Sequence, residues 1–160
     1  MFGPPDRLDR LVQALLGLAA LVGLLNGAFM LLAPARWYAA VPGVSGTGPL
    51  NLHFVRDIGV AYLASGAVLA YALPHPRGRW LAVAAGALWL SGHAAVHVGE
   101  WAAGHTHGAR FLADAPAVLG VPLLAWAALG VLLARRRVHP AGLPRALFLR
   151  TAVGEVECGP

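Results

Sequence analysis

Histidines and carboxylates gather near the ends of two apolar segments of this chain. His93 and His97 are four residues apart and Glu100 follows three residues later, steps that place side chains on one face of a helix. His53 and Asp57 share a face of a second helix in the same way. Imidazole and carboxylate are ligand types of zinc, iron, manganese and copper. We therefore predict that His93 and His97, here called the histidine pair, bind a transition metal or a small polar ligand with one or more of the other residues.

The helical rise places part of this set at one depth in a membrane. At about 1.5 Å per residue, His97 lies roughly 6 Å and His93 roughly 12 Å inside a boundary near Trp101. Asp57 lies roughly 9 Å inside a boundary near Asn51 on an antiparallel neighbour. Because each ionisable group in hydrocarbon costs about 2.5 to 3.5 kcal/mol on insertion scales, such a cluster needs mutual pairing or a bound ion. We expect Asp57 to lie beside the histidine pair.

Other interpretations of these residues stay open. Arg56 would pair with Asp57 or with Glu100 if the cluster were structural, leaving the histidines as neutral hydrogen-bonding partners. Haem is less expected than a metal ion, because the histidine pair shares one face and a second axial ligand, such as His53, would have to come from another helix. The function is accordingly a binding protein, a non-catalytic accessory subunit of a larger membrane complex, or a small membrane oxidoreductase subunit. An accessory subunit would carry no stoichiometric metal and would copurify with partners.

Long apolar stretches must position these residues. Of the 160 residues, 58% are hydrophobic and 12% are charged, which leaves a soluble domain more apolar surface than it could bury. Each stretch is long enough for a helix to cross a bilayer. We predict an all-α, four-helix transmembrane bundle over residues 1–137 and a cytoplasmic tail over 138–160. The expected helices are 11–33, 53–73, 80–100 and 114–134.

Arginine is the basic residue throughout, and its distribution predicts the topology. Only Arg36, Arg56 and Arg110 fall in the first and third connections. The others precede the first helix, lie between the second and third, or follow the fourth: Arg7, Arg10, Arg77, Arg79, Arg135, Arg136, Arg137, Arg145 and Arg150. The positive-inside rule then places both termini in the cytoplasm of a bacterial cell, with the chain in the inner membrane and the histidine pair near the outer leaflet.

This topology accounts for the net charge of +5 without binding of nucleic acid. The expected partners are the lipid bilayer and either a membrane-protein complex or further copies of the chain.

The content of sulfur-containing residues excludes two kinds of site. Cys158 is the single cysteine, so the chain forms no internal disulfide and has no Cys-x-x-Cys redox pair. Met1 and Met30 are the only methionines, too few for a methionine-rich copper site.

Smaller signals concern packing and turns. Pro34 is expected to end the first helix, and the turn formers that follow predict a loop over 35–50 with Trp37 and Tyr38 at the membrane interface. Asn26, deep in the first helix, is expected to form an interhelical hydrogen bond. Glycines are expected at helix contacts, and these are Gly17, Gly23, Gly27, Gly59, Gly66, Gly86, Gly92, Gly120 and Gly130.

One segment carries a resemblance to a known family. The residues PGV at 42–44 and TGPLNLHFVRDIGVAYL at 47–63 resemble small bacterial four-helix membrane proteins of the DoxX-like kind. The resemblance extends over the first three helices and implies the four-helix membrane architecture. Some such proteins are membrane subunits of oxidoreductase systems, but the resemblance indicates the architecture and not the activity. The histidine pair, in the third helix, is not carried over from that family and depends on its spacing alone.

Overall fold

The computed structural model describes residues 6–138, nearly all of them helical. In order, the elements are α1 (Arg7–Leu32), α2 (Pro34–Ala40), the 3-10 turn η1 (Val44–Gly46), α3 (Leu52–Tyr71), α4 (Arg79–Ala102) and α5 (Gly108–Val138). The helices α1, α3 and α4, and α5 as far as Arg135, are each long and apolar enough to cross a membrane. No strand occurs in this part of the chain. The structure therefore confirms the all-α class with four candidate membrane spans.

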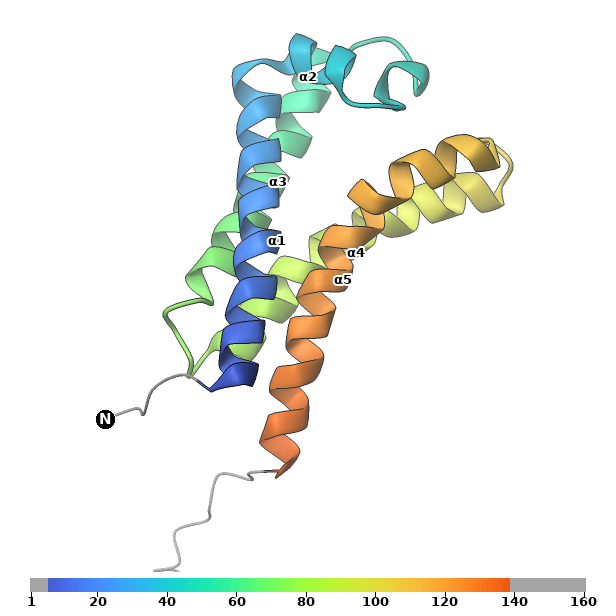
Figure 1. Cartoon of the computed structure of the whole chain (residues 1–160). Coiled ribbons are helices and arrows are strands. Elements are labelled where there is room, and N and C mark those ends of the chain that lie inside the picture. Colours follow the sequence, from blue (N-terminus) through green and yellow to red (C-terminus); the bar gives the residue numbers. More distant parts are fainter. Residues whose placement is uncertain (1–5, 139–160) are drawn as a thin grey trace, which may run out of the picture.

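Both ends of the described chain lie at one end of the bundle (Figure 1). Arg135 of α5 donates to Asp6 at 2.5 Å and to Asp9 at 2.6 Å, beside the first turn of α1. Asp6 also caps α1, because its carboxylate accepts the backbone N–H of Asp9 at 2.8 Å. That hydrogen bond, assisted by Arg135, holds the pKa of Asp6 below its usual value. We call this end the inner end and the opposite one the outer end, following the predicted topology.

Glycines bring α1 and α3 into close contact. A Cβ atom on Gly27 would lie 2.7 Å from the carbonyl oxygen of Gly59, and one on Gly66 would lie 2.8 Å from the amide nitrogen of Leu24. Only glycine permits backbones to approach this closely. The predicted contact role is thus confirmed for these glycines, and Gly23 and Gly86 also face a neighbouring helix. It is wrong for four others, which have no neighbouring atom within 4 Å of such a Cβ: Gly17, Gly92, Gly120 and Gly130.

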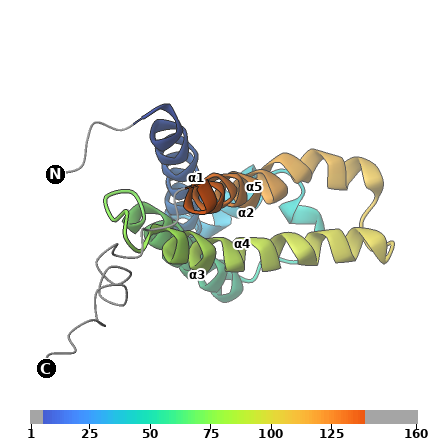
Figure 2. The ribbon, with the colours of Figure 1, turned by 90° about the horizontal axis from the view of Figure 1, so that it is seen from below.

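The bundle is closed in its inner half and open in its outer half. Residues such as Leu16, Leu69, Val83 and Ala125 form a buried core contributed by α1, α3, α4 and α5. Beyond this core, the outer parts of α4 and α5 lean away from α1 and α3 (Figures 1 and 2). The helix α5 carries Pro116 and Pro122 in its interior, and proline removes a backbone hydrogen bond and bends a helix.

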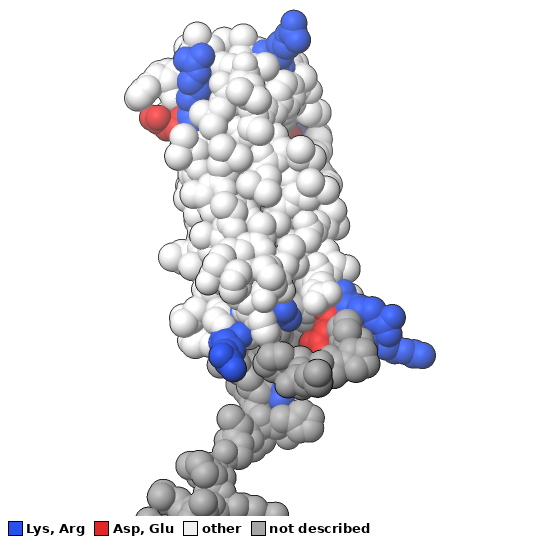
Figure 3. Space-filling model, turned by 90° about the vertical axis from the view of Figure 1, so that its left-hand side faces the viewer, with Lys and Arg blue, Asp and Glu red and all other residues white. Residues whose placement is uncertain are grey.

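Charged side chains gather at the two ends of the molecule. Figure 3 shows an uncharged band between them on the face turned to the viewer. Large apolar side chains are exposed on several helices, with Leu25 at 62%, Leu88 at 72% and Leu123 at 64%. This pattern matches a molecule whose surrounding solvent is lipid rather than water.

The helix ends differ from those expected. The helix α1 begins earlier than residue 11 because Asp6 caps it, and α5 extends beyond 114–134 in both directions. Apolar residues mark the part of a helix that crosses the bilayer, whereas hydrogen bonding carries the helix further into water. The region 35–50 is not all loop, because Pro34 starts the short helix α2. Apart from Val138, the expected tail over 138–160 lies outside the described residues.

Candidate functional site

The histidine pair lies on the side of α4 that meets α3. The ring centroids of His93 and His97 are 4.8 Å apart, with the planes at 69°. His93 stacks on Trp89 one turn away, at 5.3 Å and 12°. It also contacts Tyr62 of α3 edge to face at 5.6 Å. Both imidazoles are half-buried, so the predicted sharing of a helix face is realised and the pair is held by aromatic neighbours.

The ring nitrogens of the histidine pair are available for a ligand. Neither His93 nor His97 has a hydrogen-bond partner within residues 6–138. In the same range, every fully buried side-chain nitrogen or oxygen has a partner, so the unpaired ring nitrogens must reach the accessible surface. An imidazole nitrogen with a free lone pair is a metal ligand or a hydrogen-bonding group.

The second predicted pair forms, but on an exposed surface. His53 Nε2 lies 3.2 Å from Asp57 Oδ2, and the two side chains are 88% and 60% exposed. The spacing of four residues therefore predicted the right neighbours on α3. The carboxylate of Asp57 pairs with its own helix and not with Arg56.

The structure does not bring the two pairs into one cluster. Among the described residues, no group of three or more His, Cys, Asp or Glu side chains is close enough to hold a metal ion. Tyr62 contacts His93, whereas Asp57 lies more than one turn further out on α3. The outer part of α4 leans away from α3 (Figure 1). Glu100 is exposed near the outer end of α4. An antiparallel hairpin with the two helices side by side was expected, but α3 and α4 diverge toward the outer end, and this separates the side chains (Figure 1).

The expected ion pairs of Arg56 are also not formed. Arg56 makes no ion pair with Asp57 or Glu100 in the part of the chain that the structure describes. It lines a pocket at the outer end together with Arg36. The interpretation of the cluster as an arginine–carboxylate pair is therefore wrong in this structure.

The predicted hydrogen bond of Asn26 is confirmed, and its partner lies in α2. Trp37 Nε1 donates to Asn26 Oδ1 at 2.8 Å, which ties the short helix α2 back onto α1. Tyr38 extends this connection, since its hydroxyl donates to the carbonyl oxygen of Gly48 at 2.5 Å. The sequence predicted that Trp37 and Tyr38 lie at the membrane interface. It did not predict their hydrogen bonds, which close the 41–50 loop.

The loop over 41–50 contacts the first turns of α5. A Cβ on Gly43, whose φ is +82°, would lie 2.5 Å from the carboxylate of Asp114, and one on Gly46 would overlap the guanidinium of Arg110. The loop thus connects the α1–α3 side of the molecule to the α4–α5 side at the outer end. Arg110 and Asp114 are four residues apart and share a face of α5. Their contacts with the 41–50 loop were not predicted from the sequence.

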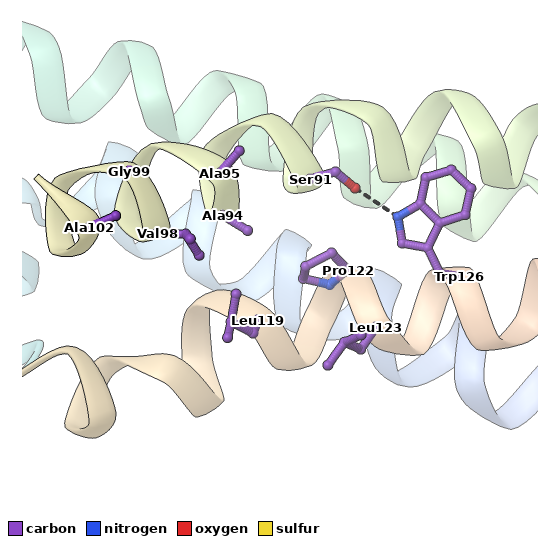
Figure 4. A pocket seen from close by; sticks show the side chains of 10 residues that line it. All are labelled: Ser91, Ala94, Ala95, Val98, Gly99, Ala102, Leu119, Pro122, Leu123 and Trp126. Carbon is purple, nitrogen blue, oxygen red and sulfur yellow. Dashed lines mark hydrogen bonds between the residues drawn. The ribbon is translucent and has the colours of Figure 1, made fainter. Parts of the chain in front are cut away.

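An apolar groove of about 570 Å³ lies between α4 and α5. Figure 4 shows its small lining residues and the hydrogen bond from Trp126 Nε1 to Ser91 Oγ, which is 2.8 Å long. Ala94 and Ala95 line it, but the histidine pair does not. The groove holds no titratable side chain, so its chemistry is that of lipid or apolar contact.

No family model, curated protein or solved structure matches this chain. The likeness to DoxX-like proteins therefore stays a prediction.

Proposed function

We propose that this chain is a multi-pass protein of the bacterial inner membrane that binds a transition metal ion through the histidine pair. The observation that carries the proposal is the pair of adjacent, half-buried imidazoles in a membrane-spanning helix whose nitrogens have no hydrogen-bond partner among the described residues. Polar groups in such a position are costly unless something satisfies them. A metal ion would satisfy both imidazoles at once.

The donor set narrows the choice of metal. The chain contributes two neutral imidazoles at this place, and the carboxylates of Asp57 and Glu100 lie apart from them. Imidazole suits zinc, copper and iron, whereas manganese prefers carboxylate and water ligands. Manganese is therefore not the expected ion, and zinc and copper are the ions to test first, with the remaining coordination positions filled by water, by a small polar ligand or by a second protein.

Elemental analysis of the full chain tests this function. The protein is purified without chelator, exposed to zinc or copper, and freed of unbound metal before the metal is counted. We expect stoichiometric metal in the parent, and a loss of most of it in His93→Gln and His97→Gln, because each removes a ligand. Bound metal should also be released on acidification, because imidazole binds a metal ion only in its unprotonated form.

Two matched controls locate the site. His105→Gln removes an exposed loop histidine and should leave the metal content unchanged. His53→Gln separates the histidine pair from the larger set predicted by spacing, and it should also retain the metal. A metal-free parent, or metal that survives both His93→Gln and His97→Gln, would overturn the proposal.

A second candidate is a non-catalytic accessory subunit of a membrane complex. The apolar groove between α4 and α5 and the open outer half of the bundle favour it, because both leave surface for another apolar element (Figure 4). This function predicts copurifying partners and no stoichiometric metal. Haem is not favoured by any contact of the described residues, since the exposed His53 is apart from the histidine pair.

A further inference from the structure

A second pocket lies at the outer end, where α1 passes into α2 and α3 begins. It has a volume of about 430 Å³. The backbone break at Ala33, with φ −141° and ψ 57°, ends α1 and lets Pro34 start α2 in a new direction. This turn brings Arg36 of α2 to the same pocket as Arg56 of α3. The pocket shares no residue with the histidine pair.

The two arginines give this pocket a concentrated positive charge. Both side chains are exposed, and neither forms an ion pair with a described carboxylate. The nearest acidic residue in sequence is Asp57, and its carboxylate lies 3.2 Å from His53 Nε2 instead. The third arginine of the outer end, Arg110, is packed against Gly46 instead. Two guanidinium groups that line one pocket without a carboxylate partner leave their donors available to an anion from outside the chain.

The rest of the pocket wall is apolar. Leu32, the last residue of α1, is 85% exposed, and Leu52, at the start of α3, is 43% exposed. Leu52 stands one turn before Arg56 on the same helix. From α1 to α2 the apolar Leu32 precedes Arg36, whereas on α3 Arg56 lies one turn deeper than Leu52. The pocket thus places apolar and cationic side chains next to one another at the outer end, as needed where acyl chains meet phosphate groups in a bilayer.

We propose that this pocket binds an anionic phospholipid, with its phosphate between Arg36 and Arg56 and its acyl chain along Leu32. Guanidinium groups bind phosphate through parallel, charge-assisted hydrogen bonds. The apolar wall distinguishes a lipid from free phosphate, because only a lipid fills both sides of the pocket. The proposal also explains why arginine stands at an end of the molecule that the positive-inside rule leaves poor in positive charge.

Lipid titration of the detergent-solubilised full chain, followed by native mass spectrometry, tests this site. The probe is phosphatidylglycerol, with phosphatidylcholine as the zwitterionic comparison. We expect the parent to prefer phosphatidylglycerol and the double variant Arg36→Gln/Arg56→Gln to bind it about tenfold or more weakly. The control Arg10→Gln/Arg77→Gln removes the same charge from exposed positions at the inner end and should bind like the parent. Circular dichroism checks that each variant is folded.

Competition with inorganic phosphate, measured on the unaltered chain, distinguishes binding of a lipid phosphate from binding of free phosphate. Inorganic phosphate at the same concentration should not displace phosphatidylglycerol from the parent. Full displacement would overturn the lipid assignment in favour of a soluble anion. Equal binding of the two lipids by the parent would also overturn it, as would equal binding of phosphatidylglycerol by the double variant and its control.

Discussion

At the scale of single residues, polar side chains within the helices find hydrogen-bond partners in the same helix or in another one. Ser91 donates to the carbonyl oxygen of Ala87 at 2.8 Å and accepts from Trp126, and Asn26 accepts from Trp37. Such bonds remove the cost of placing a polar group away from water. The histidine pair departs from this rule, since its nitrogens have no such partner in the described chain. This contrast is why we assign the pair, and not Asn26 or Ser91, to ligand binding.

Arg79 is a buried cation that caps a helix at the inner end. It is 7% exposed, and its Nε and Nη2 atoms donate to the carbonyl oxygens of Ala72 at 2.9 Å and Leu73 at 2.7 Å. These carbonyls end α3, where the helix dipole favours positive charge. We expect Arg79→Met to lower the free energy of unfolding by about 1 to 3 kcal/mol, because buried carbonyl oxygens lose their donors. Thermal unfolding in detergent measures the change.

Two variants check this assignment. Arg77→Met removes an exposed arginine two residues away and should leave the unfolding temperature close to that of the parent. Arg79→Lys keeps the charge but offers a single nitrogen, so it should fall between the parent and Arg79→Met. If Arg79→Met unfolds at the temperature of Arg77→Met, the capping role is refuted.

At the scale of elements, spacing predicted neighbours within helices but not between them. The steps of four residues correctly joined His53 to Asp57 and His93 to His97, because the helical repeat alone fixes these contacts. The meeting of Asp57 with the histidine pair depended on the angle between α3 and α4. That angle depends on how all four long helices pack, and on the bend that proline introduces into α5, so a depth estimate along straight helices missed it.

The contact between α1 and α3 depends on glycine at Gly27. A Cβ there would lie 2.7 Å from the carbonyl oxygen of Gly59 and 2.8 Å from the amide nitrogen of Leu63. Because both atoms belong to backbone, the helices would have to move apart. We expect Gly27→Ala to cost about 1 to 3 kcal/mol of stability, as overpacking does in tight cores. Loss of thermal stability in detergent is the measurement.

Gly17 on the same helix provides the matched comparison. A Cβ at Gly17 meets no atom within 4 Å, and alanine is preferred to glycine inside a helix by about 0.5 to 1 kcal/mol. Gly17→Ala should therefore unfold at the parent's temperature or above it. Equal unfolding temperatures for Gly27→Ala and Gly17→Ala would show that α1 and α3 do not pack through this glycine.

At the scale of the whole molecule, the two ends differ in structure. The inner end is held by the bonds of Arg135 to Asp6 and Asp9 and encloses the buried core. At the outer end the helices spread (Figure 1), and the 41–50 loop contacts α5 through Gly43 and Gly46. The histidine pair and the pocket lined by Arg36 and Arg56, here called the arginine pocket, both lie toward this open end. The orientation of the chain therefore decides which side of the membrane supplies their ligands.

Cysteine labelling of intact cells tests the orientation. Cys158, the single cysteine of the chain, belongs to the tail that we expect in the cytoplasm. A membrane-impermeant maleimide should therefore label it only after the cells are permeabilised. In the background of Cys158→Ser, the substitution Ser45→Cys places a thiol in the exposed turn η1 at the outer end, and this thiol should react in intact cells.

The opposite pattern would reverse the positive-inside assignment and turn the histidine pair and the arginine pocket toward the cytoplasm. The metal and lipid contacts proposed for them would then draw on the ions and the lipid leaflet of the cell interior.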